Sequence, residues 1–173
     1  MFEIEIKSRI DDPDQMEYKI KKIGAKFEME ITQEDIYFQH PCKDFKITDE
    51  TLRLRKMNNE FFLTYKGPKI DKETKTREEI ELKTDEKILD LLKNLGFSIA
   101  GAVRKIRKNY RINDMVISLD NVENLGHFVE IETFGDLETG KEKILKMASD
   151  LGLNSLERRS YFELMVGEKD GQD

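Results

Sequence analysis

Three charged side chains occupy alternate positions directly after the first residues of the chain: Glu3, Glu5 and Lys7. On a β-strand, alternate side chains point to the same face, so these three would share one face opposite an apolar one. From this segment alone, a solvated strand face is the simpler interpretation. The alternative is that two carboxylates and a cation in a row form one wall of a binding site.

Later segments repeat this alternation of charged and apolar residues. Basic residues occur in this phase at Arg53, Arg55, Lys66, Arg77, Lys105 and Arg107, and acidic residues at Glu79, Glu81, Asp120, Glu130 and Glu132. If the strands enclose a lumen, like charges about 4 Å apart would repel by roughly 4 kcal/mol at an effective dielectric constant of 20. The carboxylates would therefore need a cation, and oxygen ligands select Mg²⁺ or Mn²⁺. The arginines and lysines suit phosphate oxygens. The pattern thus indicates a metal-assisted polyphosphate site.

The elements that must position these residues are mostly strands. Period-two runs cover the N-terminal segment and residues 26–38, 51–57, 60–66, 76–83, 102–112, 115–121 and 127–134. Asn58-Asn59 and Asn113-Asp114 are typical of tight hairpin turns, so neighbouring strands should be antiparallel. An α+β protein with a closed, antiparallel eight-stranded β-barrel is predicted, because closure removes the exposed edges and places the charges in a tunnel under externally packed helices.

Three segments have a helical period, and each ends at a glycine suited to a left-handed cap. The first begins at Asp12-Pro13, the second after Thr84 and the third near Glu138. Their predicted buried stripes are Met16, Ile20 and Ile23; Ile88, Leu91, Leu92 and Leu95; and Ile144, Leu145, Ala148 and Leu151. Residues 41–50 and 67–75 are predicted loops. Residues 1–166 should form a single domain, followed by a flexible tail over 167–173.

Composition excludes several classes of function. The chain has 173 residues, with 30 basic and 36 acidic side chains and a net charge of −6, which argues against nucleic-acid and anionic-membrane binding. No apolar run approaches the roughly 18 residues of a membrane span, and a cytoplasmic location is predicted. Cys42 is the only cysteine, and with His40 and His127 it forms no zinc pattern. Whether a homodimer covers part of the outer face is left open.

The opening Glu3-x-Glu5-x-Lys7 resembles the ExExK signature of CYTH proteins, the triphosphate tunnel metalloenzymes. The resemblance continues, in the family's order and over residues 2–165, through Arg53-x-Arg55, Thr64-x-Lys66-Gly67, Arg77-x-Glu79-x-Glu81, Lys105-x-Arg107 and Asp120-x5-Gly126-x3-Glu130-x-Glu132. It implies an eight-stranded tunnel that binds two Mg²⁺ or Mn²⁺ ions. The implied metal ligands are Glu3, Glu5, Asp120, Glu130 and Glu132, and the implied catalytic phosphate contacts are Lys7, Arg53, Arg55, Lys66, Lys105 and Arg107. Arg77 could contact substrate or belong to a salt-bridge network within the lumen.

The family includes class IV adenylyl cyclases and thiamine triphosphatases, so the resemblance implies two chemistries. Residues 33–38 and 159–164 are most similar to the cyclase-type branch, which converts ATP to cyclic AMP and pyrophosphate. The alternative is hydrolysis of inorganic triphosphate, thiamine triphosphate or a nucleoside triphosphate, and a third possibility is a non-catalytic triphosphate-binding module. No residue stands out as a general base.

Overall fold

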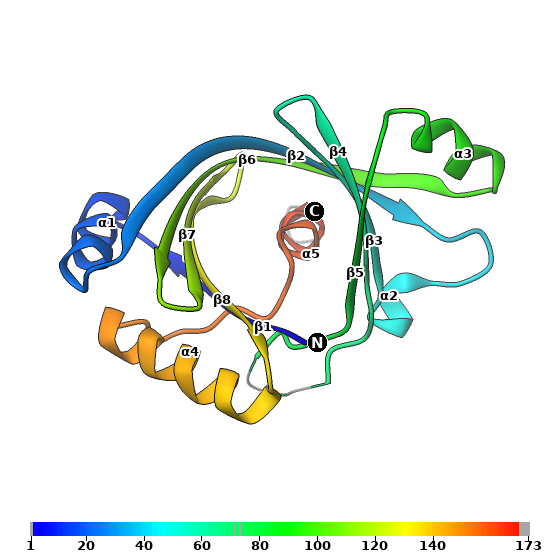
Figure 1. Cartoon of the computed structure of the whole chain (residues 1–173). Coiled ribbons are helices and arrows are strands. Elements are labelled where there is room, and N and C mark those ends of the chain that lie inside the picture. The colour runs from blue at the N-terminus through cyan, green and yellow to red at the C-terminus, as the bar shows by residue number, and fades with distance from the viewer. Residues whose placement is uncertain (1, 71, 73, 170–173) are drawn as a thin grey trace.

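The computed structural model describes residues 2–70, 72 and 74–169, which form one curled sheet with helices packed against it (Figure 1). The strands are β1 (Phe2–Ile10), β2 (Lys26–Gln39), β3 (Thr51–Met57), β4 (Glu60–Lys66), β5 (Glu79–Thr84), β6 (Ser98–Ile112), β7 (Met115–Val122) and β8 (Gly126–Gly135). The helices are α1 (Pro13–Lys22), α2 (Phe45–Thr48), α3 (Ile88–Asn94), α4 (Leu137–Leu151) and α5 (Tyr161–Lys169). All eight strands belong to one sheet in the order β1-β8-β7-β6-β2-β3-β4-β5, and the paired strands are antiparallel.

The sheet curls until its two edges meet. Just before β5, Arg77 forms an isolated bridge with Glu3 of β1, and the Lys75 amide donates a 2.9 Å hydrogen bond to the Glu5 carbonyl. Residues 76–78, predicted to begin a strand, therefore lie at the seam, where these contacts replace a continuous ladder between β1 and β5. The predicted α+β tunnel of eight antiparallel strands is confirmed (Figure 1).

The predicted hairpins are also confirmed. Asn58 and Asn59 have φ values of 50° and 61°, which the turn between β3 and β4 requires at its two central positions. Asn113, with φ 53°, turns β6 into β7. Because asparagine tolerates this left-handed region better than most residues, these positions set the registers that place alternate side chains inside the tunnel.

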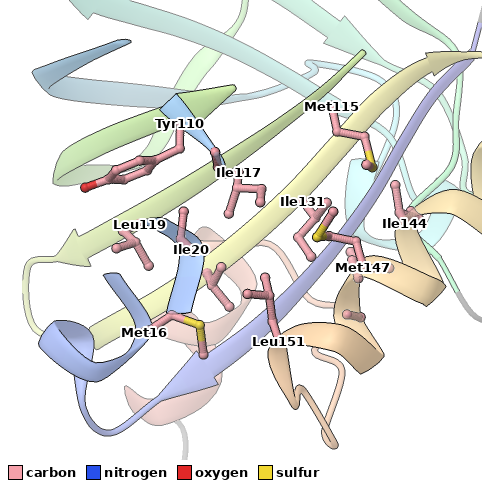
Figure 2. Close-up of a cluster of buried hydrophobic side chains, with 14 of the residues drawn as sticks. Met16, Ile20, Tyr110, Met115, Ile117, Leu119, Ile131, Ile144, Met147 and Leu151 are labelled. Atoms are coloured by element: carbon pink, nitrogen blue, oxygen red, sulfur yellow. The ribbon is translucent and has the colours of Figure 1, made fainter. Parts of the chain in front are cut away.

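Helices α1 and α4 cover the outer face of the sheet, as predicted. The Asp12 side chain caps α1 by accepting a 2.9 Å hydrogen bond from the Gln15 amide, and α4 ends at Gly152 with φ 76°. Figure 2 shows the resulting core, in which both helices pack against the apolar face of the strands. Its labelled members are Met16, Ile20, Tyr110, Met115, Ile117, Leu119, Ile131, Ile144, Met147 and Leu151. In the described part of the chain, no helix is long and apolar enough to cross a membrane.

The stripe predicted for the second helix is only partly buried. Leu92 packs into a small cluster with Phe38 and Leu54, whereas Leu91 and Leu95 are 55% and 62% exposed. The prediction was wrong for these two leucines because α3 has only seven residues, too few turns to bury a wide stripe. A partner protomer on this outer face stays a prediction.

Two helices were not predicted. Helix α2 lies within the predicted loop 41–50, and α5 continues through Gly167 into the predicted tail, whose residues 170–173 lie outside the described residues. Helix α5 starts with a capping box: the Glu163 amide donates to Ser160 Oγ, and the Ser160 amide donates to Glu163 Oε2. In Figure 1, α5 lies within the ring outlined by the strands.

Close packing of α4 on the sheet depends on Gly140. A Cβ atom there would lie 2.3 Å from Ile4 Cδ1 and 3.3 Å from Thr133 Cγ2. Gly140→Val should therefore lower the free energy of unfolding by about 1–3 kcal/mol, the usual cost of overpacking. Urea denaturation followed by circular dichroism measures this. The control is Gly167→Val, where no atom lies within 4 Å of the added Cβ. Equal stability of the two variants would contradict this packing argument.

Candidate functional site

The inward strand faces bring most of the predicted site residues to one cavity of about 250 Å³ within the tunnel, here called the lumen. Its basic lining residues are Lys7, Arg53, Arg55, Lys66, Lys75, Arg77, Lys105 and Arg107. Its acidic lining residues are Glu3, Asp35, Glu79, Glu81, Glu130 and Glu132. Two predicted residues, Glu5 and Asp120, are not in this lining but bind cations that are. The alternation of charges along the sequence thus translates into one charged site.

Arg107 is fixed by two carboxylates at once. Its Nε and Nη2 atoms donate to Asp120 Oδ1 and Oδ2 at 2.7 and 2.6 Å, and Nη2 also donates to Glu130 Oε2. Tyr161 Oη donates to Asp120 Oδ2 at 2.7 Å. Burial would raise the pKa of Asp120, but Arg107 and Lys105 outweigh it and hold that pKa below its usual value. Asp120 therefore orients Arg107, and the metal-ligand role predicted for Asp120 stays a prediction.

A second carboxylate, Asp35 of β2, orients the arginines of β3. Arg55 Nε and Nη2 donate to Asp35 Oδ1 and Oδ2 at 2.7 and 2.8 Å, and Arg53 Nη1 lies 3.8 Å from Oδ2. The Asp35 side chain is 1% exposed, yet the two guanidinium groups lower its pKa against the opposing effect of burial. Asp35 thus holds two predicted phosphate contacts in place before any ligand arrives.

We expect Asp35→Asn to lower the free energy of unfolding by about 2–3 kcal/mol, because the buried Arg55 loses its ionic partner. Added triphosphate should raise the melting temperature of this variant more than that of the wild type, since the ligand would replace the lost negative charge. Thermal unfolding with and without inorganic triphosphate measures both effects. Glu34→Gln is the control, because Glu34 pairs with the exposed Arg104 outside the tunnel. Asp35→Asn behaving like this control would contradict the positioning role.

Arg53 retains unused hydrogen-bonding capacity in the lumen. Its Nη2 atom donates to Thr64 Oγ1 at 3.2 Å, and Thr64 Oγ1 in turn donates to Glu81 Oε2 at 3.0 Å. Within the described residues, the buried Nε of Arg53 has no acceptor. A buried donor without an acceptor is energetically costly unless a ligand or a water molecule accepts its hydrogen bond. This position therefore suits an oxygen-rich anion.

Four carboxylates lie on the adjacent strands β1 and β8. The strand register pairs Glu5 with Glu132 and Lys7 with Glu130. Lys66 Nζ lies 2.7 Å from Glu3 and 2.6 Å from Glu79, and Lys75 Nζ lies 2.5 Å from Glu5. Among the described residues, no three acidic, histidine or cysteine groups are arranged to hold a metal ion in this conformation.

The donor chemistry of this wall nevertheless fits a hard divalent cation, because all four groups are carboxylates. Burial raises the pKa of Glu3, and burial, with further contributions from Glu3, Glu5 and Glu130, raises the pKa of Glu132 to about 7 despite Arg107. The raised pKa values mean that the ionised form of these buried carboxyl groups is disfavoured, chiefly because burial removes them from water. A divalent cation would stabilise that ionised form.

The opposite imbalance occurs around Tyr161 of α5. Lys7 Nζ lies 4.2 Å and Lys105 Nζ 4.8 Å from the centroid of the Tyr161 ring. Burial, with Lys75 adding repulsion, lowers the pKa of Lys7 to about 7, and burial with Arg107 lowers the pKa of Lys105 to about 8. The cationic forms of these two lysines are thus disfavoured, chiefly by burial, and a polyanion beside them would stabilise their positive charge.

The raised pKa of Glu132 predicts a pH dependence of stability in metal-free protein. A carboxyl group with a folded-state pKa of about 7 and an unfolded value of about 4.3 stabilises the fold fully below the lower value. That contribution is lost as the pH rises through 7. Lys7 does not change the pH dependence of the free energy of unfolding below pH 7. Its pKa is about 7 in the folded protein and 10.5 ordinarily, so it affects stability only between these two pH values.

Urea denaturation at pH 5 and pH 7 tests this linkage. From pH 5 to pH 7, the wild type should lose up to about 3 kcal/mol more stability than Glu132→Gln, which cannot titrate. If the free energy of unfolding changed equally in the two proteins between pH 5 and pH 7, the raised pKa of Glu132 would be contradicted.

The sequence analysis did not predict several lining residues of the lumen, among them Asp35, Lys75 and Tyr161. Asp35 lies in phase on β2 with Gln33 and Tyr37, so collecting the inward face of that strand would have found it. Lys75 lies in a predicted loop and Tyr161 in an unpredicted helix, where no period-two signal exists. Arg77 lines the lumen and is 5% exposed, and both of its predicted roles, substrate contact and salt-bridge partner, stay predictions.

Fold and lumen together define a charged-tunnel protein, with basic groups suited to a polyanion and carboxylates suited to a divalent cation. A family model described as the CYTH domain matches residues 1–161. The chain therefore belongs to the CYTH family, as the opening ExExK pattern indicated.

Curated relatives share nearly the full length of the chain. A Methanocaldococcus jannaschii protein provisionally named an adenylate cyclase is 44% identical over 173 residues, covering 95% of this chain and 98% of the relative. The adenylate cyclase CyaB of Aeromonas hydrophila is 28% identical over 169 residues, covering 92% and 86%.

Solved structures confirm the fold. A Pyrococcus horikoshii protein is 43% identical with a TM-score of 0.88, covering 96% of this chain and 99% of that one. A Hippeastrum protein described as having a dominant triphosphatase activity is 20% identical, with a TM-score of 0.69 and coverage of 97% and 96%. At that identity, the similarity concerns the fold alone.

Proposed function

We propose that this protein is a divalent-metal-dependent enzyme that converts ATP to cyclic AMP and pyrophosphate. The observation that carries the proposal is the lumen itself, where eight basic side chains line one cavity beside the carboxylates of β1 and β8. Membership of the CYTH family and the names of the curated relatives support the same substrate class.

In this proposal, the basic residues bind and orient the triphosphate. Arg53, Arg55 and Arg107 offer planar forks for phosphate oxygens, and carboxylates hold these forks in position. Lys7, Lys66 and Lys105 add compact charges that stabilise the negative charge developing on the α-phosphoryl group and on the leaving pyrophosphate. Preorganisation matters because the groups need not rearrange during the reaction.

The carboxylates of Glu3, Glu5, Glu130 and Glu132 would hold two Mg²⁺ or Mn²⁺ ions. A bound divalent ion supplies charge neutralisation at phosphate oxygens and lowers the pKa of a coordinated hydroxyl or water. Lys66 and Lys75 form ion pairs with Glu3 and Glu5. If these carboxylates held a metal ion, both lysines would be available to bind phosphate oxygens instead.

Hydrolysis of a triphosphate is the second candidate. The same lumen residues could bind a triphosphate for attack by water as well as by a ribose hydroxyl. The Hippeastrum protein of the same fold is described as having a dominant triphosphatase activity. Fold similarity does not choose between these outcomes.

Product analysis distinguishes the candidates. Purified protein is incubated with Mg²⁺ or Mn²⁺ and, separately, with ATP, thiamine triphosphate or inorganic triphosphate, and phosphorus NMR follows the products. Cyclic AMP with pyrophosphate supports the cyclase, whereas orthophosphate release overturns it in favour of hydrolysis. Tight binding of a triphosphate without turnover would indicate a non-catalytic binding module.

A further inference from the structure

Tyr161, the first residue of α5, contacts both acidic and basic groups of the site. It is 4% exposed and lines the lumen. Its hydroxyl donates a 2.7 Å hydrogen bond to Asp120 Oδ2. Its ring centroid lies 4.2 Å from Lys7 Nζ and 4.8 Å from Lys105 Nζ. The proposed reaction uses both lysines and leaves the tyrosine without a role.

The two lysines come from strands that are not neighbours. Lys7 is on β1 and Lys105 on β6, and β8 and β7 lie between these strands in the sheet. Strand pairing therefore fixes the two backbones but not the ends of two flexible side chains. Tyr161 reaches both ends because α5 lies within the ring of strands (Figure 1). Its own ring packs edge-to-face on Phe128 of β8, with centroids 5.0 Å apart, which restrains its orientation.

An aromatic ring holds a lysine without neutralising it. The negative face of the ring attracts an ammonium group within about 6 Å, and this attraction is stronger away from water. Lys7 and Lys105 are 1% and 4% exposed, so both have lost most of their hydration. Lys66 and Lys75 instead pair with carboxylates. Because the ring carries no net charge, the positive charge of the first two lysines remains available to an anion.

Both ammonium groups also keep hydrogen-bond donors. Lys7 Nζ donates one hydrogen bond to the carbonyl oxygen of Arg159, just before α5. Lys105 Nζ lies 3.6 Å from Asp120 Oδ2 and 3.9 Å from Asp35 Oδ2, which is longer than a normal hydrogen bond. Since an ammonium group has three N–H donors, each lysine can donate to phosphate oxygens while it stays beside the ring.

We propose that Tyr161 is a positioning residue of the triphosphate site, whose ring holds Lys7 and Lys105 as a pair that contacts phosphate oxygens. This inference rests on the proposed function and makes α5 part of the phosphate-binding machinery. The hydroxyl is secondary, because Arg107 already binds both carboxylate oxygens of Asp120.

Calorimetric titration with Mg²⁺ and bis(methylene)triphosphate tests the proposal. This analogue has methylene groups in place of the bridging oxygens, so it is not hydrolysed, and it has no organic base. Tyr161→Leu should weaken its binding at least about tenfold, because two ammonium contacts are lost. Tyr161→Phe restores the ring and should recover most of the lost affinity.

The matched control is Tyr110→Leu. Tyr110 is fully buried in the core on the outer side of the sheet, so the same atoms are removed away from the lumen. This variant should bind the analogue like the wild type. Equal weakening in Tyr110→Leu and Tyr161→Leu would overturn the proposal, because a general loss of packing would then explain both.

Proton NMR of the lysine ε-methylene groups tests the contact even if Tyr161→Leu folds poorly. Ring current should shift the signals of Lys7 and Lys105 upfield from that of Lys21, which forms a surface ion pair with Glu17. Variants with methionine at each position assign the signals. The shifts should persist in the wild type saturated with analogue and in Tyr161→Phe.

The outcomes separate this inference from the proposed function. Wild-type affinity in Tyr161→Leu, affinity in Tyr161→Phe as low as in Tyr161→Leu, or unshifted lysine signals would overturn the role of the ring, while the lumen assignment survives if the wild type binds the analogue. If the wild type does not bind the analogue, both the inference and the proposed function fail.

Discussion

Replacing Arg107 with methionine is expected to lower the free energy of unfolding by about 3–5 kcal/mol and to abolish triphosphate turnover. The stability loss follows because Asp120 and Glu130, both buried, would lose their shared cationic partner. Turnover would be lost because the fork that faces the lumen disappears. Urea denaturation and a product assay with ATP and Mg²⁺ measure the two effects.

The matched control for Arg107 lies on the same strand. Arg104 points outward, its side chain is 64% exposed, and it pairs with Glu34 at the surface. Arg104→Met should therefore change stability by no more than about 1 kcal/mol and leave turnover intact. Arg107→Lys tests geometry separately, since it keeps the charge but loses the bidentate fork. An Arg107→Met variant as stable and active as Arg104→Met would refute the role assigned to this arginine.

Replacing Glu130 with glutamine is expected to reduce metal-dependent turnover by at least about 100-fold while leaving the fold intact. Glutamine keeps an oxygen that can accept the hydrogen bond from Arg107, but it lacks the charge that a divalent ion requires. The readout is turnover as a function of Mg²⁺ concentration, with circular dichroism as the test of folding.

Glu123→Gln serves as the control, because Glu123 is exposed and lies between β7 and β8. Turnover by Glu123→Gln should depend on Mg²⁺ concentration as turnover by the wild type does. Normal Mg²⁺ dependence in Glu130→Gln would remove Glu130 from the metal site and leave Glu3, Glu5 and Glu132 as the remaining candidates.

Much of the fold and of the lumen could be predicted from the alternation of charged and apolar residues. This alternation can be seen within each strand, yet it determines which side chains from distant strands share the inner face of the sheet. Once Glu3, Glu5 and Lys7 share a strand face, curling the sheet directs that face inward together with Arg53, Arg107 and their equivalents. The asparagine turns had similar predictive value, because few residues accept the backbone conformation that they require.

The rest depends on tertiary contacts without a local signature. Lys75 reaches Glu5 only because the chain before β5 closes the seam of the tunnel. Tyr161 meets Asp120 only because α5 packs against the tunnel from within the ring of strands. The exposure of Leu91 and Leu95 likewise depends on how little of the sheet a short α3 covers. The periodicity of the sequence does not predict these contacts or the exposure of these leucines.

The most direct test of a metal-triphosphate site in the lumen is a crystal structure with Mn²⁺ and a non-hydrolysable ATP analogue. We expect anomalous Mn²⁺ peaks at the carboxylates of Glu130 and Glu132, with the triphosphate in contact with Arg53 and Arg107. Lys66 and Lys75 should have moved from their carboxylate partners toward phosphate oxygens. A triphosphate bound outside the lumen, or lumen carboxylates still paired only with lysine and arginine in the presence of saturating Mn²⁺ and analogue, would contradict the proposed site.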